Sequence, residues 1–78
     1  MSTEELLRQE GLEPLTSRER QILPLLDKDL TNKEIARELV LAPGTVKVHT
    51  GNLYRKLGVD NRRAAVTLAK ALGLLAAD

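Results

Sequence analysis

The 78-residue sequence contains no cysteine, no tryptophan and no phenylalanine, and only one tyrosine and one histidine. Without cysteine the chain can form no disulfide and no thiolate metal site, which fits a reducing compartment such as the cytoplasm. With a single histidine besides, we expect no metal site and no cofactor. The lone tyrosine, Tyr54, argues against a stacking platform for single-stranded nucleic acid.

Long apolar runs and low-complexity segments are also absent from the sequence. No stretch approaches the roughly 20 apolar residues that span a bilayer, and no signal peptide is recognisable. We therefore expect no membrane partner. The length is that of one small domain, whose hydrophobic core is marginal without disulfides or metals to reinforce it.

No catalytic constellation is recognisable either. The two serines, Ser2 and Ser17, stand where helices are expected to begin, far in sequence from His49. The sequence has no glycine-rich phosphate loop and no paired carboxylates in an apolar setting, which are patterns that nucleotide binding and acid–base catalysis use. We therefore expect neither an enzyme nor a small-molecule ligand.

The net charge of +1 conceals an uneven distribution along the chain. Residues 1–30 carry four basic and seven acidic side chains, whereas residues 31–63 carry seven basic and three acidic ones. Between residues 42 and 59 there is no acid at all. Surface helices normally mix both signs, so this middle segment indicates an anionic partner, although a merely solvated surface would have the same composition.

Capping-box patterns, in which Ser or Thr is followed three residues later by Glu, begin at Ser2, Thr16 and Thr31. The first predicts a short additional helix over residues 2–10, or else a linker remnant, so we assign 1–13 to an extension and 14–78 to the domain. Apolar spacing predicts an all-α fold with four helices, over about 17–28, from 32 onward, over 43–57 and over about 62–72. Pro24 is expected to kink or loosen the first of these.

The segment 43–57 is predicted to be a helix with two different faces. The expected buried stripe follows a spacing of four, three and four residues and comprises Val46, Thr50, Leu53 and Leu57. The opposite face is small and basic and carries Lys47, Val48, Gly51 and Arg55. A short helix, a tight turn and a second, basic helix predict a helix-turn-helix whose second helix enters a DNA major groove.

The last predicted helix has more apolar surface than a small core needs. One line comprises Val66, Ala69 and Leu72, and a second, weaker side comprises Ala65, Leu68 and Ala76. Surplus apolar surface favours self-association. Burial of both sides within one monomer is equally compatible with the pattern.

Four motifs follow one another in the sequence, LTSRE at 15–19, NKEIA at 32–36, TVKVH at 45–49 and YRKLGV at 54–59. Together they resemble the LuxR-type helix-turn-helix domain of bacterial transcription regulators, and the resemblance extends over residues 13 to about 75. The resemblance implies base contacts from Lys47, Val48 and the position of Gly51. It implies phosphate contacts near Asn32, Lys33, Thr45 and Arg55. We add His49 to this group, although a partly packed, neutral histidine is the alternative. The resemblance also implies a homodimer on double-stranded DNA through the last helix, with Arg63, Val66 and Lys70 at the interface.

The sequence departs from the family pattern at several positions. Asp29 stands where glycine is usual, and Ala42 replaces a serine cap whose loss costs about 1 kcal/mol. Ala64 replaces a glutamate in the first turn of the last helix. Gly51 costs about 1 kcal/mol of helix propensity and offers no side chain to a base.

Three functions remain open at this point. The first is a sequence-specific transcription regulator, either stand-alone or the C-terminal effector domain of a longer protein. The second is the promoter-reading domain of sigma factors, against which the helix at 62–72 argues because that domain usually ends near its recognition helix. The third is a helical protein-interaction module that does not bind DNA, in which the basic residues are ordinary solvated or capping side chains.

Overall fold

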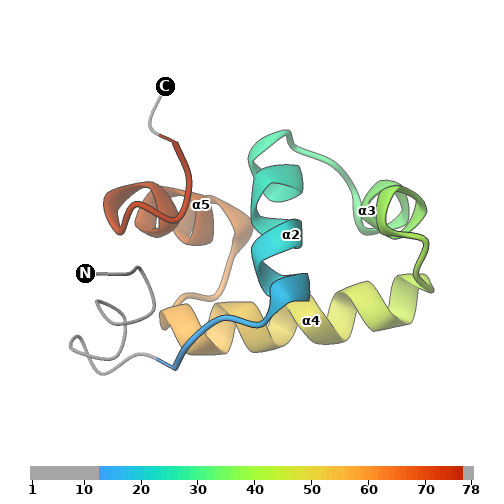
Figure 1. Ribbon diagram of the computed structural model, residues 1–78, viewed down its shortest axis with the longest axis horizontal. Coiled ribbons are helices and arrows are strands. Elements are labelled where there is room, and N and C mark those ends of the chain that lie inside the picture. Colours follow the sequence, from blue (N-terminus) through green and yellow to red (C-terminus); the bar gives the residue numbers. More distant parts are fainter. Residues whose placement is uncertain (1–12, 77–78) are drawn as a thin grey trace.

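The computed structural model describes residues 13–76, and the predicted four-helix, all-α fold is confirmed within them. The helices are α2 (Ser17–Asp27), α3 (Asn32–Leu39), α4 (Pro43–Leu57) and α5 (Arg62–Ala71). The short helix expected at residues 2–10 lies outside the described residues. In Figure 1, α4 lies along the lower edge, and the other three helices lie above it: α3 near its N-terminal end, α2 at its middle and α5 over its C-terminal end.

Both expected capping boxes in this part of the chain are present. The Thr16 hydroxyl accepts a hydrogen bond from the Glu19 amide at 3.2 Å, and the Glu19 carboxylate accepts one from the Thr16 amide at 2.8 Å. Thr31 and Glu34 repeat this exchange at 3.2 and 2.9 Å. Each box satisfies two amides that a helix start leaves without partners, so α2 and α3 begin where the sequence predicts.

Pro24 does not end α2. The helix continues through it to Asp27, and Lys28, the last residue predicted to be helical, is the C-cap. The Lys28 amide bonds to the Pro24 carbonyl at 3.1 Å, so hydrogen bonding resumes past the proline. The exposed ring lies on the solvent side of the helix, where it displaces no core contact.

The two turns that flank α3 both contain a non-glycine residue with positive φ. Asp29 has φ 63° in the α2–α3 turn, and Val40 has φ 55° in the α3–α4 turn. Asp tolerates this region better than most residues, whereas a β-branched side chain is a clear outlier there. Val40 is also 89% exposed, so no core packing of its side chain offsets the strain.

One hydrophobic core joins all four helices. α4 packs against α2, α3 and α5, and α5 also packs against α2. The fully or nearly buried apolar side chains are Leu15, Ile22, Leu23, Leu26, Ile35, Ala36, Val46, Leu53, Leu57, Ala65 and Ala69. α4 therefore packs against the rest of the domain with one side, and its other side is exposed to solvent.

Within residues 13–76, no helix has the length and apolar character needed to cross a membrane.

Candidate nucleic-acid interface

The inner face of α4 matches the predicted stripe. Val46, Leu53 and Leu57 are buried with Thr50. The Thr50 hydroxyl donates to the Val46 carbonyl one turn earlier at 2.8 Å, which satisfies the only polar side chain on this face. The opposite face is thereby fixed toward solvent.

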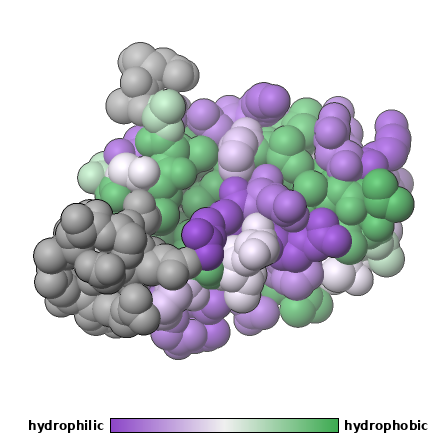
Figure 2. Space-filling model, viewed as in Figure 1, coloured by the Kyte–Doolittle hydropathy of each residue, from purple (hydrophilic) through white to green (hydrophobic). Residues whose placement is uncertain are grey.

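The outer face of α4 exposes the predicted base-contact residues. Lys47, Val48 and Gly51 are all exposed, and Val48 is 62% exposed although it is apolar. Asn52 is exposed four residues after Val48 on the same side, and sequence reasoning missed it. The sequence could have predicted this exposure, because the spacing that defines the buried stripe also places residue 52 on the solvent-facing side of the helix. Figure 2 shows mainly hydrophilic surface along the edge where α4 lies, interrupted by a small hydrophobic spot.

The predicted phosphate-contact residues lie at the starts of α3 and α4, in the middle of α4 and near its C-terminal end. Asn32 and Lys33 are the first residues of α3, and Thr45 lies in the first turn of α4; all three are exposed. His49 is half-buried on the flank of α4. Within residues 13–76, neither Lys33 nor Lys47 forms an ion pair, so both ammonium groups can meet an outside anion.

Arg55, the remaining predicted phosphate contact, is engaged within the domain. Its Nη1 lies 3.0 Å from Oε1 of Glu13, and both side chains are about 60% exposed. Beside it, Lys56 Nζ lies 2.8 Å from Glu19 Oε1 and donates to the Pro14 carbonyl at 3.2 Å. Only 10% and 2% of the Lys56 and Glu19 side chains are exposed, so this second pair is buried.

Sequence reasoning did not anticipate either ion pair. The two residues of each pair are 42 and 37 positions apart in the sequence. From the sequence alone, Glu19 was expected only to cap α2. Burial alone would raise the pKa of Glu19. The hydrogen bonds from Lys56 and from the Thr16 amide outweigh this, so the pKa lies below its ordinary value and the carboxylate stays charged.

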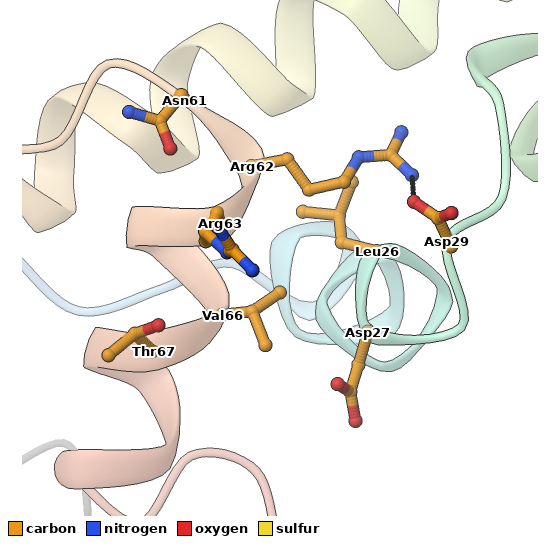
Figure 3. A pocket seen from close by; sticks show the side chains of 8 residues that line it. All are labelled: Leu26, Asp27, Asp29, Asn61, Arg62, Arg63, Val66 and Thr67. Atoms are coloured by element: carbon orange, nitrogen blue, oxygen red, sulfur yellow. Dashed lines mark ion pairs between the residues drawn. The ribbon is translucent and has the colours of Figure 1, made fainter.

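The predicted dimer-interface residues share one side of α5. Arg63 is exposed, Val66 is partly buried, and Lys70 Nζ lies 3.4 Å from Asp27 of α2. Ala65 and Ala69, one from each apolar line of the sequence, face the core. Val66, Arg63 and Thr67 line a groove of about 520 Å³ together with Leu26 and Asp27 of α2. Figure 3 shows the Val66 side chain pointing from α5 toward Leu26 and Asp27. An ion pair of 3.5 Å between Arg62 and Asp29 borders this groove.

Comparison with known proteins agrees with this arrangement. A family described as bacterial regulatory proteins, luxR family, matches residues 13–69. The chain belongs to the LuxR family. The crystal structure of response regulator ChrA, of a heme-sensing two-component system, is similar, with 43% identity and a TM-score of 0.78. The match covers 81% of this chain and 31% of that one, so this LuxR-family chain spans about a third of the response regulator.

Membership of the LuxR family confirms the sequence resemblance and indicates DNA-binding transcription regulation. α5, the helix that argued against a sigma-factor domain, is present. In the described part of the chain, no group of three or more His, Asp or Glu side chains could hold a metal ion.

Proposed function

We propose that this chain binds specific sequences of double-stranded DNA as a homodimer and regulates transcription, with α4 in the major groove. The observation that carries the proposal is the outer face of α4, which has an exposed lysine, an exposed valine and no acid. A helix of this size fits the major groove, where each base pair presents a distinct pattern of donors, acceptors and methyl groups.

Lys47, Val48 and Gly51 are the proposed base-contact positions. Lys47 can donate to the acceptors of guanine, and the methyl groups of Val48 suit the methyl group of thymine. At Gly51 an added Cβ would meet no protein atom within 4 Å, so the backbone itself can approach the base edges. We add Asn52, whose amide can both donate to and accept from a base or a phosphate.

Phosphate contacts are assigned to residues on both sides of this face. Asn32 and Lys33 begin α3, where free backbone amides and the helix dipole favour an anion. Thr45 and His49 flank the N-terminal half of α4, and Arg55 lies near its C-terminal end. These contacts would position the domain on the duplex without selecting a sequence.

The salt dependence of affinity tests this proposal. A dimer that neutralises about 6–8 phosphates should show a slope of log affinity against log salt of about −5 to −7. The measurement is fluorescence anisotropy with a random duplex, followed by selection of a preferred operator. No binding at low salt, or a slope near zero, would favour the protein-interaction module instead.

The dimer is assigned to the side of α5 that carries Arg63, Val66 and Lys70. Support comes from the groove that Val66 and Arg63 line and from the exposed Thr67 beside them. On DNA, two half-sites roughly one helical turn apart are expected. Val66→Glu should weaken cooperative operator binding. Val66 also packs against the core, so this substitution can destabilise the fold as well.

Thr67→Arg provides a cleaner test, because it adds bulk and charge at an exposed position without removing a packed side chain. It should reduce cooperative operator binding while the helical circular dichroism stays unchanged. If the unmodified chain binds a single half-site as tightly as the full operator, the dimer assignment is wrong.

The domain context stays a prediction. We assign residues 14–78 to the DNA-binding domain and 1–13 to an extension, and we place the protein in the cytoplasm, where its DNA would be. Similarity to part of a response regulator favours an effector domain of a larger regulator over a stand-alone one.

A further inference from the structure

The segment in front of α2 is held against the C-terminal end of α4. Leu15 is buried in the core, and the Pro14 carbonyl accepts a hydrogen bond from Lys56 at 3.2 Å. These two contacts fix the position of the residue before them. Glu13 therefore meets Arg55 across 42 residues of sequence, with 3.0 Å between Oε1 and Nη1.

We propose that Glu13 is an autoinhibitory residue, whose carboxylate occupies the Arg55 guanidinium and competes with a DNA phosphate for it. The inference rests on the proposed function, which assigns a phosphate contact to Arg55. A carboxylate and a phosphate offer the guanidinium the same kind of oxygen acceptors. Glu13 engages Nη1 of Arg55 and places a negative charge beside it, which repels a phosphate that approaches the same guanidinium. Part of the binding energy is therefore lost when DNA displaces Glu13.

The pair is suited to exchange because it is exposed. Both side chains are about 60% accessible, so water and salt screen the attraction and either partner can leave. Exposed ion pairs of this kind change an equilibrium by roughly two- to five-fold. The neighbouring Lys56 cannot replace Arg55, because its ammonium is held by the buried Glu19 carboxylate.

A double-mutant cycle on the full chain tests the competition. The variants are Glu13→Gln, Arg55→Gln and their combination, with Glu38→Gln as a control that removes the same charge from an exposed site on α3. Fluorescence anisotropy with a random duplex at low salt isolates phosphate binding. Glu13→Gln should tighten binding about two- to five-fold beyond Glu38→Gln, and this excess should vanish in the Arg55→Gln background.

A second readout follows the carboxyl group of Glu13 by NMR. Its hydrogen bond and charge interaction with Arg55 hold the pKa of Glu13 below its ordinary value, with Lys56 lowering it further and Glu19 opposing. If DNA draws Arg55 away, the pKa of Glu13 should rise on addition of duplex, as it should in Arg55→Gln without DNA. The negative charge of DNA also raises the pKa of a nearby carboxyl group directly. For a merely structural ion pair, the rise in the pKa of Glu13 on DNA should therefore be the same in the Arg55→Gln variant as in the unmodified chain.

The outcomes separate the two proposals. If the unmodified chain fails to bind any duplex, the proposed function and this inference both fall. If the unmodified chain binds but Glu13→Gln weakens binding, the inference alone is overturned, and Glu13 orients Arg55 for DNA instead. If Glu13→Gln binds as tightly as Glu38→Gln, the inference is also overturned, and Glu13 has no specific effect on DNA affinity.

Discussion

The two ends of α4 are built differently. At the C-terminal end, Gly58 adopts a left-handed conformation, and Lys56 forms a buried ion pair with Glu19. At the N-terminal end, Ala42 makes no side-chain cap, and the turn before it contains the strained Val40. The C-terminal end is secured by a glycine C-cap and by an ion pair with a residue 37 positions earlier. The N-terminal end packs against α3 but has neither a side-chain cap nor an ion pair among the described residues.

This difference suits a helix that meets its ligand with its N-terminal half. The amides of a first helical turn have no partners within the helix, and a side-chain cap would satisfy one of them. In the first turn of α4, Pro43 has no amide and the Thr45 amide donates to the Ala42 carbonyl at 3.0 Å, so the Gly44 amide is the one that an outside anion can meet. The secured C-terminal end maintains the orientation of the helix. The following predictions test this contrast, from the largest expected effect to the smallest.

Removing the buried contact at the C-terminal end should have the largest effect. Glu19→Ala leaves the Lys56 ammonium buried without its carboxylate and removes half of the α2 capping box. Breaking a buried pair in this way costs about 3–5 kcal/mol of the free energy of unfolding. Urea unfolding followed by circular dichroism measures it, with Glu13→Ala in the exposed pair as the control. Equal losses in the two variants would contradict the distinction between them.

The same carboxylate predicts a pH dependence of stability. The pKa of Glu19 is lowered in the folded state, and the unfolded value is about 4.3. Its contribution is therefore complete above the unfolded pKa and is lost as the pH falls through the folded pKa. Lowered pKa values at Glu13 and Glu34 act in the same direction.

The expected result is that the unfolding free energy of the unmodified chain falls from about pH 5 downward. Glu19→Gln should show a shallower fall, measured as urea midpoints from neutral to acidic pH. If both curves remain parallel, the ionised form of Glu19 is not what stabilises the domain.

The contrast between local and distant contacts explains how much the sequence could predict. The capping boxes at Thr16 and Thr31 and the stripe from Val46 to Leu57 depend on neighbours within a few residues, and these predictions are confirmed. The partners of Lys56 and Arg55 lie about 40 residues away, and no local pattern encodes them. The left-handed backbone of Val40 was not predicted for another reason. It follows from the tight turn between α3 and α4 and opposes the conformational preference of valine.

At the N-terminal half of α4, Lys47→Ala should reduce affinity for the selected operator by about 1–3 kcal/mol and flatten preference at one or two base pairs. Arg55→Ala should weaken operator and scrambled duplex by similar factors and make the salt slope shallower by about 1 per subunit. Affinities for both duplexes across a salt series measure this. If Lys47→Ala preserves the ratio of operator affinity to scrambled-duplex affinity while Arg55→Ala abolishes it, the C-terminal end of α4, and not its N-terminal end, reads the bases.

Restoring a cap should reduce the difference between the two ends. Ala42→Ser offers a hydroxyl as a second acceptor to the amide of Thr45, which already donates to the Ala42 carbonyl at 3.0 Å. It should therefore raise the free energy of unfolding by no more than about 1 kcal/mol. Ala71→Ser, at an exposed position in the last turn of α5, is the matched control because no free amide lies within its reach. A gain no larger than that of the control would mean that the first turn of α4 needs no side-chain cap.

Gly51→Ala separates stability from function on the outer face itself. Gly51 lies inside α4, its φ is not positive, and an added Cβ would meet no protein atom within 4 Å. Nothing in the fold therefore requires glycine there, and alanine should stabilise the helix by about 0.5–1 kcal/mol. If this face lies against base edges, the same methyl group should weaken operator binding. Urea unfolding without DNA and operator affinity measure the two effects on one variant. A variant that is more stable and binds the operator at least as tightly would show that no base approaches residue 51.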